Sequence, residues 1–309
     1  MKYTYANFNP CFFSPMENKN NASKRISVII PCLNAANTIG QQLNALVHQS
    51  VAPWEVLVSD NGSTDGSQEI VHQYVDRLPK LRVIDASGYR GASHARNKGA
   101  AVATGNYLAF CDADDVVSAD WISALEKAFA KHDFVASRFD YNLLNDSTVN
   151  AVQDSGLQNF RVPFLPFAGA CGLGIKRSLH EAVSGFDEDF THLEDAEYCL
   201  RVQRLGTPLF FVPDAIVHIR YSASQDHSFI SSRKASFKHG YNWGNGLAKI
   251  YQRYRAEGMY LHGIIPRLAV SIFYFFRCII SGFHCDNIWK LGWHIGVLHG
   301  FIQNRIMQL

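Results

Sequence analysis

Short apolar runs alternate with amphipathic stretches through the first half of the chain. Runs rich in Val, Ile, Leu and Phe are typical of buried β-strands, and we expect strands at residues 26–31, 55–59, 81–84, 107–111 and 134–138. Between these runs the apolar residues recur at helical spacing, which predicts helices at 37–49, 67–78, 93–104 and 120–132. Ser93 and Ser118 are the expected N-caps of the last two helices. Strands that alternate with helices predict an α/β fold with a doubly wound, mostly parallel sheet flanked by helices.

The pattern changes after residue 150. A segment at 164–175 is rich in Gly, Ala and aromatic residues, and an amphipathic helix is expected at 193–205. Two further strands are expected at 208–212 and 215–219. From about residue 230 onward the sequence is helical in pattern and rich in aromatic residues.

Polar loops follow the first four expected strands. They read PCLNAANT, DNGSTDGS, DASGYRG and DADD. Open parallel sheets bind ligands outside the carboxyl ends of their strands. These four segments should therefore line one crevice.

The acidic loop suggests a divalent cation. Asp112 and Asp114 are two residues apart at a strand end, so they should point the same way, with Asp115 turned aside. Carboxylates this close repel one another unless a cation lies between them, and Mg²⁺ or Mn²⁺ prefers such oxygen ligands. The alternative is an acidic turn that caps the next helix.

The loop after the second strand offers another carboxylate. Asp60 directly follows the strand, where it can accept a hydrogen bond from a ligand. Asp65 lies further along, and we expect it to cap the helix that follows.

The order IPCLNAANTI, VSDNGSTDGS, GYRGASHARNKGAAVATGNYLAFCDADD resembles the family 2 glycosyltransferases, which have the GT-A fold. The stretch SGFDEDFTHLEDAEYCLRVQRLGTPLFFVPDAIVHIRYS is similar to the acceptor half of the same family. The resemblance implies a GT-A catalytic domain at 25–229, with a nucleotide-binding half at 25–118 and an acceptor half at 119–229. A polar leader at 1–24 and a helical, basic and aromatic extension at 230–309 lie outside it.

The resemblance implies an inverting glycosyltransferase that moves a sugar from a nucleotide-diphosphate sugar to a glycan or lipid-linked acceptor in polysaccharide biosynthesis, with Mg²⁺ or Mn²⁺ as cofactor. The resemblance places Asp60 at the nucleotide base, where an aspartate suits the N3–H donor of uracil or thymine. A UDP-sugar is therefore preferred over a GDP-sugar. The alternatives are a sugar nucleotidyltransferase, a phosphohydrolase with Asp112 as nucleophile, and a non-catalytic protein that binds nucleotide sugars or glycans. A nucleotidyltransferase usually has a Gly-rich, basic loop after the first strand, and residues 32–36 contain neither Gly nor Lys.

The resemblance also assigns roles to individual residues. It implies that Asp195 is the catalytic base, and that Asp114 and His218 hold the metal, although His218 could instead be a buried strand residue. Asn61 stands where the family commonly has a second Asp. The expected substrate-binding residues are Pro31, Asn34, Asp60, Asn61, Arg96, Asp112 and Glu194.

Asp195 can also be argued from its neighbours. A transferase of this kind must remove a proton from the acceptor hydroxyl, and a carboxylate can do this. Asp195 begins a helix, whose dipole lowers its pKa, whereas Glu194 and Glu197 are like charges that raise it. The sequence leaves the direction of the shift open. The alternative is that the three acids only cap the helix.

Charge is unevenly distributed along the chain. Residues 231–309 contain ten Lys/Arg and two Asp/Glu, a balance of +8, whereas residues 1–230 contain nineteen and twenty-five, a balance of −6. The C-terminal part also contains fourteen of the 39 aromatic residues. This combination favours a membrane surface as partner over nucleic acid, which is not expected. The alternative is a basic helical subdomain packed on the rest of the chain.

An apolar segment at 264–283 contains Arg267 and Arg277. Ten residues separate the two arginines, which places them within about 80° of each other around a helix. They should share one side, as in a helix that lies in a membrane interface. A spanning helix and a plain packed helix are the alternatives.

The expected location is cytoplasmic, with a peripheral position on the inner face of the plasma membrane. Residues 1–25 lack the apolar core of a secretory signal. The seven cysteines are odd in number and include no CxxC pair, which argues against a disulfide framework or a zinc site.

Overall fold

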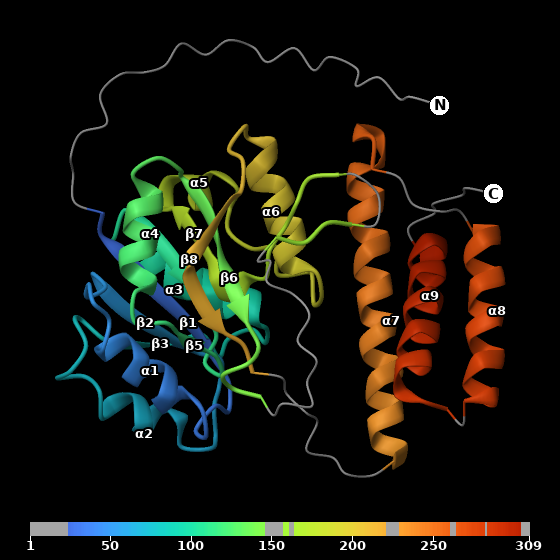
Figure 1. Ribbon diagram of the computed structural model, residues 1–309, viewed down its shortest axis with the longest axis horizontal. Helices are drawn as coiled ribbons and strands as arrows, with labels where there is room; N and C mark the ends of the chain where they lie inside the picture. The colour runs from blue at the N-terminus through green and yellow to red at the C-terminus, as the bar shows by residue number, and fades with distance from the viewer. Residues whose placement is uncertain are drawn as a thin grey trace.

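The computed structural model describes residues 24–145, 157–160, 164–220, 229–259, 264–281 and 283–303. Apart from Lys24, the predicted leader at 1–24 lies outside the described residues. The described part consists of a sheet flanked by helices on both faces and three long helices beside it (Figure 1).

The sheet has eight strands among the described residues, in the order β3-β2-β1-β4-β7-β6-β8-β5. Strands β1 to β4 pair in parallel, as do β6 and β8, whereas β7 and β5 are antiparallel to their neighbours. The expected mostly parallel sheet is therefore confirmed. The strands are β1 Ile26–Cys32, β2 Glu55–Asp60, β3 Arg82–Asp85, β4 Tyr107–Phe110, β5 Val116–Val117, β6 Phe134–Asp140, β7 Leu173–Lys176 and β8 Phe210–His218.

Two hydrophobic clusters cover the two faces of the sheet. Along β1, Ile29 points into one cluster and its neighbours Val28 and Ile30 point into the other, as the alternation of a strand requires. Helices α1, α2 and α4 close the Val28 face, and α3, α6, α7 and α9 close the Ile29 face. The helices are α1 Ile39–Val47, α2 Ser67–His72, α3 Ala92–Val102, α4 Trp121–Phe129, α5 Arg177–Ala182, α6 Glu194–Arg204, α7 Phe229–Tyr254, α8 Ile264–Ile280 and α9 Cys285–Gln303.

Two predicted helix caps are wrong. The residue before α3 is Gly91, whose φ of 148° suits a glycine, and Ser93 is buried inside the helix. The residue before α4 is Asp120, and Ser118 contributes only its backbone carbonyl, which accepts the N–H of Trp121. In both places tertiary packing and backbone geometry set the start of the helix.

The acceptor half differs most from expectation. The two strands predicted at 208–212 and 215–219 form the single strand β8, with a register irregularity opposite Ser137 and Arg138. Strand β7 was not predicted, because its short segment LGIK carries no alternating pattern. It inserts antiparallel between β4 and β6. The predicted boundary between residues 229 and 230 falls at the first residues of α7.

Helices α7 and α9 cross at very close range. A Cβ added at Gly244 of α7 would overlap the carbonyl oxygen of Trp293, and one added at Gly296 of α9 would overlap that of Tyr241. Glycine at these positions lets the two backbones touch. Helix α8 packs on α9, on the side away from the sheet (Figure 1).

The prediction that Arg267 and Arg277 share one side is wrong. Arg267 is buried, with its guanidinium 4.7 Å from the centre of the Trp293 ring, whereas Arg277 is exposed. The reason is that α9 covers the side of α8 on which Arg267 lies. Within the described ranges, every helix is too short or too polar to cross a bilayer.

Candidate active site

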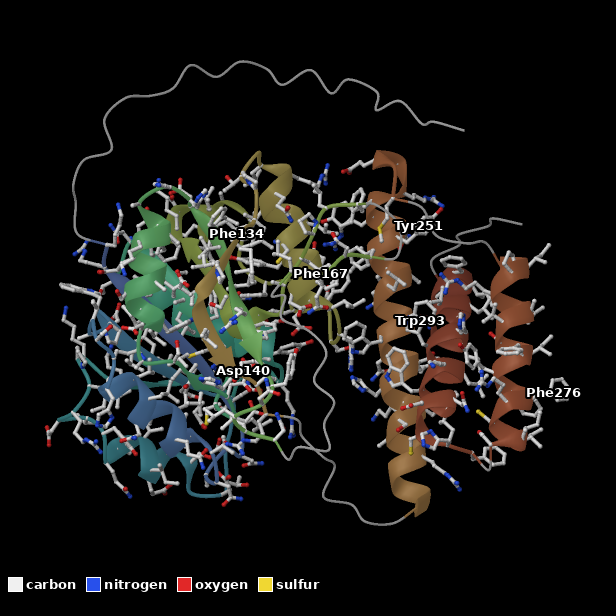
Figure 2. All side chains as sticks on the ribbon, viewed as in Figure 1. Phe134, Asp140, Phe167, Tyr251, Phe276 and Trp293 are labelled. Atoms are coloured by element: carbon white, nitrogen blue, oxygen red, sulfur yellow. The ribbon has the colours of Figure 1, made fainter. Side chains whose placement is uncertain are left out.

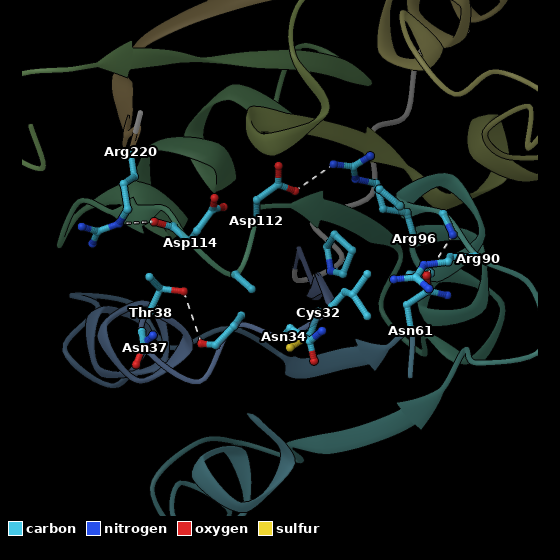
Figure 3. Close-up of a pocket in the computed structure, with 17 residues that line it drawn as sticks. Cys32, Asn34, Asn37, Thr38, Asn61, Arg90, Arg96, Asp112, Asp114 and Arg220 are labelled. Atoms are coloured by element: carbon cyan, nitrogen blue, oxygen red, sulfur yellow. Dashed lines mark hydrogen bonds and ion pairs between the residues drawn. The ribbon is translucent and has the colours of Figure 1, made fainter. Parts of the chain in front are cut away.

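A cavity of about 720 Å³ opens at the carboxyl ends of β1, β2 and β4. Figure 3 shows the side chains that surround it, which come from the loops after β1, β2, β3 and β4, the start of α3 and the segment just after β8. This is where an open parallel sheet binds its ligands. The polar and charged residues that line it are Asn34, Asn37, Thr38, Asn61, Arg90, Arg96, Asp112, Asp114 and Arg220.

The acidic loop after β4 contributes two carboxylates to this cavity. Asp112 and Asp114 both line it, whereas Asp115 is buried and accepts a hydrogen bond from the backbone N–H of Arg220 at 3.0 Å. Asp115 is thus turned away from the cavity, as expected, but one of its carboxylate oxygens still lies within 4.8 Å of one of Asp112. Burial, together with the charge of Asp112, raises the pKa of Asp114 above its usual value and that of Asp115 to about 8.

A buried arginine joins the acidic loop to the far side of the site. Arg96 on α3 is 4 % exposed and donates from Nη2 to Asp112 at 2.8 Å and from Nη1 to Glu194 at 3.4 Å. Burial disfavours its charge, but the carboxylates of Asp112 and Glu194 outweigh that effect and raise its pKa. Arg96 therefore remains a cation and bridges the loop after β4 to the start of α6.

The start of α6 carries the predicted base. Leu193, directly before the helix, has a left-handed backbone with φ of 62° and a buried side chain, a conformation that costs about 1 kcal/mol or more for a bulky residue. Asp195 follows two residues later and is half-buried. Burial, and then the like charge of Glu194, raise the pKa of Asp195 to about 7. The direction of the pKa shift of Asp195, which the sequence left open, is therefore upward.

Glu197, the third acid of this turn, is not a free carboxylate. It is fully buried and accepts from Arg201 at 2.8 Å and from Arg253 of α7. Its charge is paired on both sides, and Glu194 is the neighbouring acid whose charge raises the pKa of Asp195.

Asp60 has one oxygen occupied and one without a partner. Its Oδ2 accepts the backbone N–H groups of Gly62 and Ser63 at 3.2 and 3.1 Å, and the amide of Gln68 at 2.8 Å. Its Oδ1 is buried and meets no donor among the described residues. A buried, unsatisfied carboxylate oxygen requires an explanation, and a ligand donor would supply one. Asp60 lies beside the residues that line the cavity but is not one of them.

Asn61 lines the cavity, but its polar atoms are all engaged within the protein. Its Nδ2 donates to the carbonyls of Ala86 at 2.5 Å and Tyr89 at 2.8 Å, and its Oδ1 accepts the N–H of Gly91 at 2.8 Å. Asn61 thereby fixes the loop that carries Arg90.

Of the remaining predicted residues, two line the cavity and one does not. Pro31 and Asn34 line the cavity, and the Oδ1 of Asn34 accepts the N–H of Thr64 at 2.9 Å. His218 does not line it. The Nδ1 of His218 lies 2.5 Å from Asp140. Burial raises the pKa of Asp140, but the hydrogen bonds from His218 and Asn142 together bring it below its usual value.

Two cavity arginines and a cysteine were missed by sequence reasoning. Arg90 is exposed at the cavity, and its guanidinium has no partner within the described ranges. Arg220 donates to the carbonyl of Asp114 at 3.0 Å and to Gln41 at 2.7 Å. Cys171 lies with its Sγ within 4.8 Å of carboxylate oxygens of Asp112 and Asp115. The loop sequence GYRG, an Arg between glycines, could have pointed to Arg90. Nothing local pointed to the other two.

The donor set at the cavity fits a hard divalent cation. Asp112 and Asp114 offer carboxylate oxygens, which Mg²⁺ and Mn²⁺ prefer. The neighbouring group of Asp112, Asp115 and Cys171 fits less well, because burial raises the pKa of Cys171 well above its usual range and leaves it a neutral thiol. A metal is therefore best accommodated on the cavity side of the loop.

Comparison with known proteins identifies the family. The family model Glycosyl transferase family 2 matches residues 27–183. The Escherichia coli K12 protein described as uncharacterized glycosyltransferase YibD is 41 % identical over 97 residues, which cover 31 % of this chain and 28 % of that protein. The Escherichia coli protein WfgD, described as a UDP-Glc:alpha-D-GlcNAc-diphosphoundecaprenol beta-1,3-glucosyltransferase, is 26 % identical over 68 % of this chain and 80 % of its own.

Solved structures share the fold. The mannosyltransferase PcManGT of Pyrobaculum calidifontis, in complex with GDP-Man and Mn²⁺, aligns with a TM-score of 0.58 and 16 % identity over 92 % of this chain and 88 % of its own. Residues 1–349 of S. aureus TarS, in complex with UDP, align with a TM-score of 0.54 and 17 % identity over 90 % and 91 %. The expected GT-A fold is confirmed. Because the family model matches just over half of its length, this chain belongs to glycosyltransferase family 2.

Proposed function

We propose that this glycosyltransferase is an inverting, metal-dependent enzyme. It moves a sugar from a nucleoside diphosphate sugar, with a UDP-sugar preferred, to a hydroxyl of a glycan or lipid-linked acceptor in polysaccharide biosynthesis. One observation carries the proposal: the contacts from Asp112 through Arg96 to Glu194 link the cavity to Asp195, a carboxylate whose pKa is about 7. A base with that pKa is matched to removing a proton near neutral pH.

The donor would occupy the cavity with its base near Asp60. The unpartnered Oδ1 of Asp60 can accept the N3–H of uracil, which is the reason for preferring UDP. Arg90 and Arg220 place positive charge at the cavity, where the diphosphate would lie. The neighbours bind UDP in one case and GDP-Man in the other, so the nucleotide of this enzyme needs its own test.

Asp114 and Asp112 are the residues that would hold the metal, with His218 as a further predicted ligand. The Nδ1 of His218 is held by Asp140, and histidines that bind metals through their other nitrogen commonly have such a partner. Mg²⁺ or Mn²⁺ bound there would offset negative charge on the departing diphosphate.

Asp195 is the proposed base. As the acceptor oxygen forms its bond to the anomeric carbon, the bond from that carbon to the diphosphate breaks, and the acceptor proton passes to Asp195. The nucleoside diphosphate leaves with the bonding electrons, and the anomeric configuration inverts without a covalent intermediate. Arg96 keeps the start of α6 beside the acidic loop during this step.

The acceptor and the location follow from charge and from one relative. WfgD is described as acting on a diphosphoundecaprenol-linked sugar, and residues 231–309 of this chain carry a balance of +8. Basic segments are attracted to anionic lipid. A lipid-linked acceptor, met by a peripheral enzyme on the cytoplasmic face of the membrane, is consistent with both.

A donor panel tests the proposal. Purified protein is incubated with UDP-, GDP- and dTDP-sugars, an acceptor, and Mn²⁺ or Mg²⁺, and release of the nucleoside diphosphate is measured. We expect acceptor-dependent release that chelation abolishes, loss of about 10²-fold or more in Asp114→Asn, and a product of inverted configuration by NMR. A retained configuration, full activity without metal, or pyrophosphate release from a nucleoside triphosphate and a sugar phosphate would each contradict it.

A further inference from the structure

Helix α8 exposes a continuous apolar face. We call the six residues that form it the α8 apolar face, and each of them is 50–62 % exposed. They are Ile265, Leu268, Ile272, Phe275, Phe276 and Ile279. At about 100° per residue they fall within an arc of about 100° along the whole helix. Figure 2 shows Phe276 projecting away from the helix bundle.

The opposite side of α8 is the polar one. Arg267 is buried against Trp293, and the hydroxyl of Ser271 is buried and donates to the carbonyl of Arg267 at 2.8 Å. A helix on the surface of a protein in water has the reverse arrangement, with its apolar stripe inward. Large exposed apolar patches mark interaction surfaces. The α8 apolar face is therefore built to meet something other than water.

Charge indicates what covers this face. Helix α8 contains no Asp or Glu, and Arg277 is exposed in its last turn. Lys290 of α9 is also exposed and lies 5.9 Å from the ring of Tyr274 on α8. Two copies of this region, each with a balance of +8 over residues 231–309, would repel, whereas an anionic lipid surface would attract it.

We propose that the α8 apolar face inserts into the interfacial layer of an anionic bilayer, with α8 lying in the membrane plane. Phe and Ile side chains would enter the boundary between headgroups and acyl chains, and Arg277 and Lys290 would contact lipid phosphates. Helix α8 lies on the side of α9 away from the sheet (Figure 1). The cavity lies at the carboxyl ends of β1, β2 and β4, so insertion leaves it clear. The purpose of docking, access to a lipid-linked acceptor, rests on the proposed function; the binding itself does not.

Vesicle flotation of the full chain tests the proposal without donor or acceptor. We expect binding to phosphatidylglycerol/phosphatidylcholine vesicles that is weakened by salt, and much weaker binding to phosphatidylcholine alone. Combining Ile272→Gln, Phe276→Gln and Ile279→Gln should lower the partition coefficient by about 10²-fold, because these three side chains form half of the α8 apolar face and would each lose their apolar burial in the bilayer. The matched control combines Val75→Gln, Leu143→Gln and Leu205→Gln, which are also exposed apolar residues, and should bind as the wild type does.

Circular dichroism and thermal melting confirm that both triple variants are folded. Equal binding by the α8 variant and the wild type overturns the proposal. So does a wild-type dimer in analytical ultracentrifugation that the α8 variant abolishes without any vesicle binding, since the face would then join two copies. Release of nucleoside diphosphate with a water-soluble acceptor should be unchanged in the α8 variant. Failure of the transferase proposal would appear in that assay and failure of docking in flotation, so the two are distinguishable.

Discussion

The pKa of Asp195 gives the proposed reaction a defined pH dependence. A base must be unprotonated, so kcat should rise with pH as Asp195 loses its proton and level off above about pH 8. Asp195→Asn should lower kcat by about 10²-fold or more and remove the rise. The pH profile of nucleoside diphosphate release measures both.

Glu194→Gln is the control for this profile. Because the charge of Glu194 contributes to the raised pKa of Asp195, its removal should move the rise to lower pH. A profile that stays in place in Glu194→Gln, or a rise that persists in Asp195→Asn, would assign the titration to another group.

The ionised carboxylate of Asp195 should also lower the free energy of unfolding. A pKa raised from about 3.9 to about 7 means that the folded state prefers the protonated form, so the contribution to stability is complete below about pH 4 and is lost as the pH rises to about 7. Asp195→Asn should therefore raise the free energy of unfolding by about 1–2 kcal/mol at about pH 8 and change it little at about pH 4. Urea denaturation without metal measures this, and an equal effect at both pH values would contradict it.

At the residue scale, local sequence rules predict which polar side chains meet at a site, but not how deeply the fold buries them. The prediction that Asp112 and Asp114 line one crevice needs only local information. Residues i and i+2 at a strand end point the same way, and the strands of a parallel sheet all end at the ligand-binding edge. The direction of the Asp195 shift was not predictable, since it depends on burial by distant segments. Arg220 was missed for the same reason: β8 brings it to the loop of Asp114 only through the fold.

At the scale of elements, the crossing of α7 and α9 predicts an unusual response to alanine. In an exposed helix Gly→Ala is stabilising, by about 0.5–1 kcal/mol. At Gly244 a Cβ would overlap the carbonyl oxygen of Trp293, so Gly244→Ala should instead destabilise by about 2 kcal/mol or more. Chemical denaturation measures the sign.

Gly40 of α1 is the matched control. A Cβ there would meet only side-chain atoms, at 3.5 and 3.7 Å, so Gly40→Ala should be neutral or stabilising. If Gly244→Ala behaved as Gly40→Ala does, the two helices would not touch as described.

The elements found from sequence are those with strong periodic patterns. Strands β1, β2 and β4 and helix α6 were predicted within a few residues, because apolar runs and amphipathic spacing are sufficient signals. Strand β7 was missed and β8 was divided in two, because their existence depends on pairing with β4 and β6. Strand pairing in the folded sheet, which the local sequence pattern does not show, defines both of these strands.

At the scale of the whole molecule, the long helices are not an independent appendage. Leu247 and Tyr251 of α7 and Phe301 of α9 belong to the same hydrophobic cluster as Ile29 of β1 and Leu200 of α6. The sequence showed only that this region is helical, basic and aromatic, since no periodic pattern reveals which surface a helix will cover. Its core contact with α6, the helix that carries Asp195, is visible only in three dimensions.

An ion pair makes this coupling measurable. Arg253 of α7 pairs with the fully buried Glu197 of α6, two residues beyond Asp195, and with Asp187 at 2.9 Å. Arg253→Met should destabilise the protein by about 1–3 kcal/mol, because it leaves a buried carboxylate with Arg201 as its remaining cation. It should also lower kcat, because the first turn of α6, which carries Asp195, loses the ion pair that ties it to α7.

A double-mutant cycle separates this pair from general packing. In a Glu197→Gln background the cost of Arg253→Met should fall by about 1–2 kcal/mol, since no buried charge is then left behind. Arg204 pairs with Glu257 at 2.7 Å where both side chains are partly exposed, so Arg204→Met should cost about 0.5 kcal/mol or less. Equal costs at the two arginines, or full additivity in the cycle, would mean that α7 supports α6 through apolar contact alone, and the catalytic effect of Arg253→Met should then be absent.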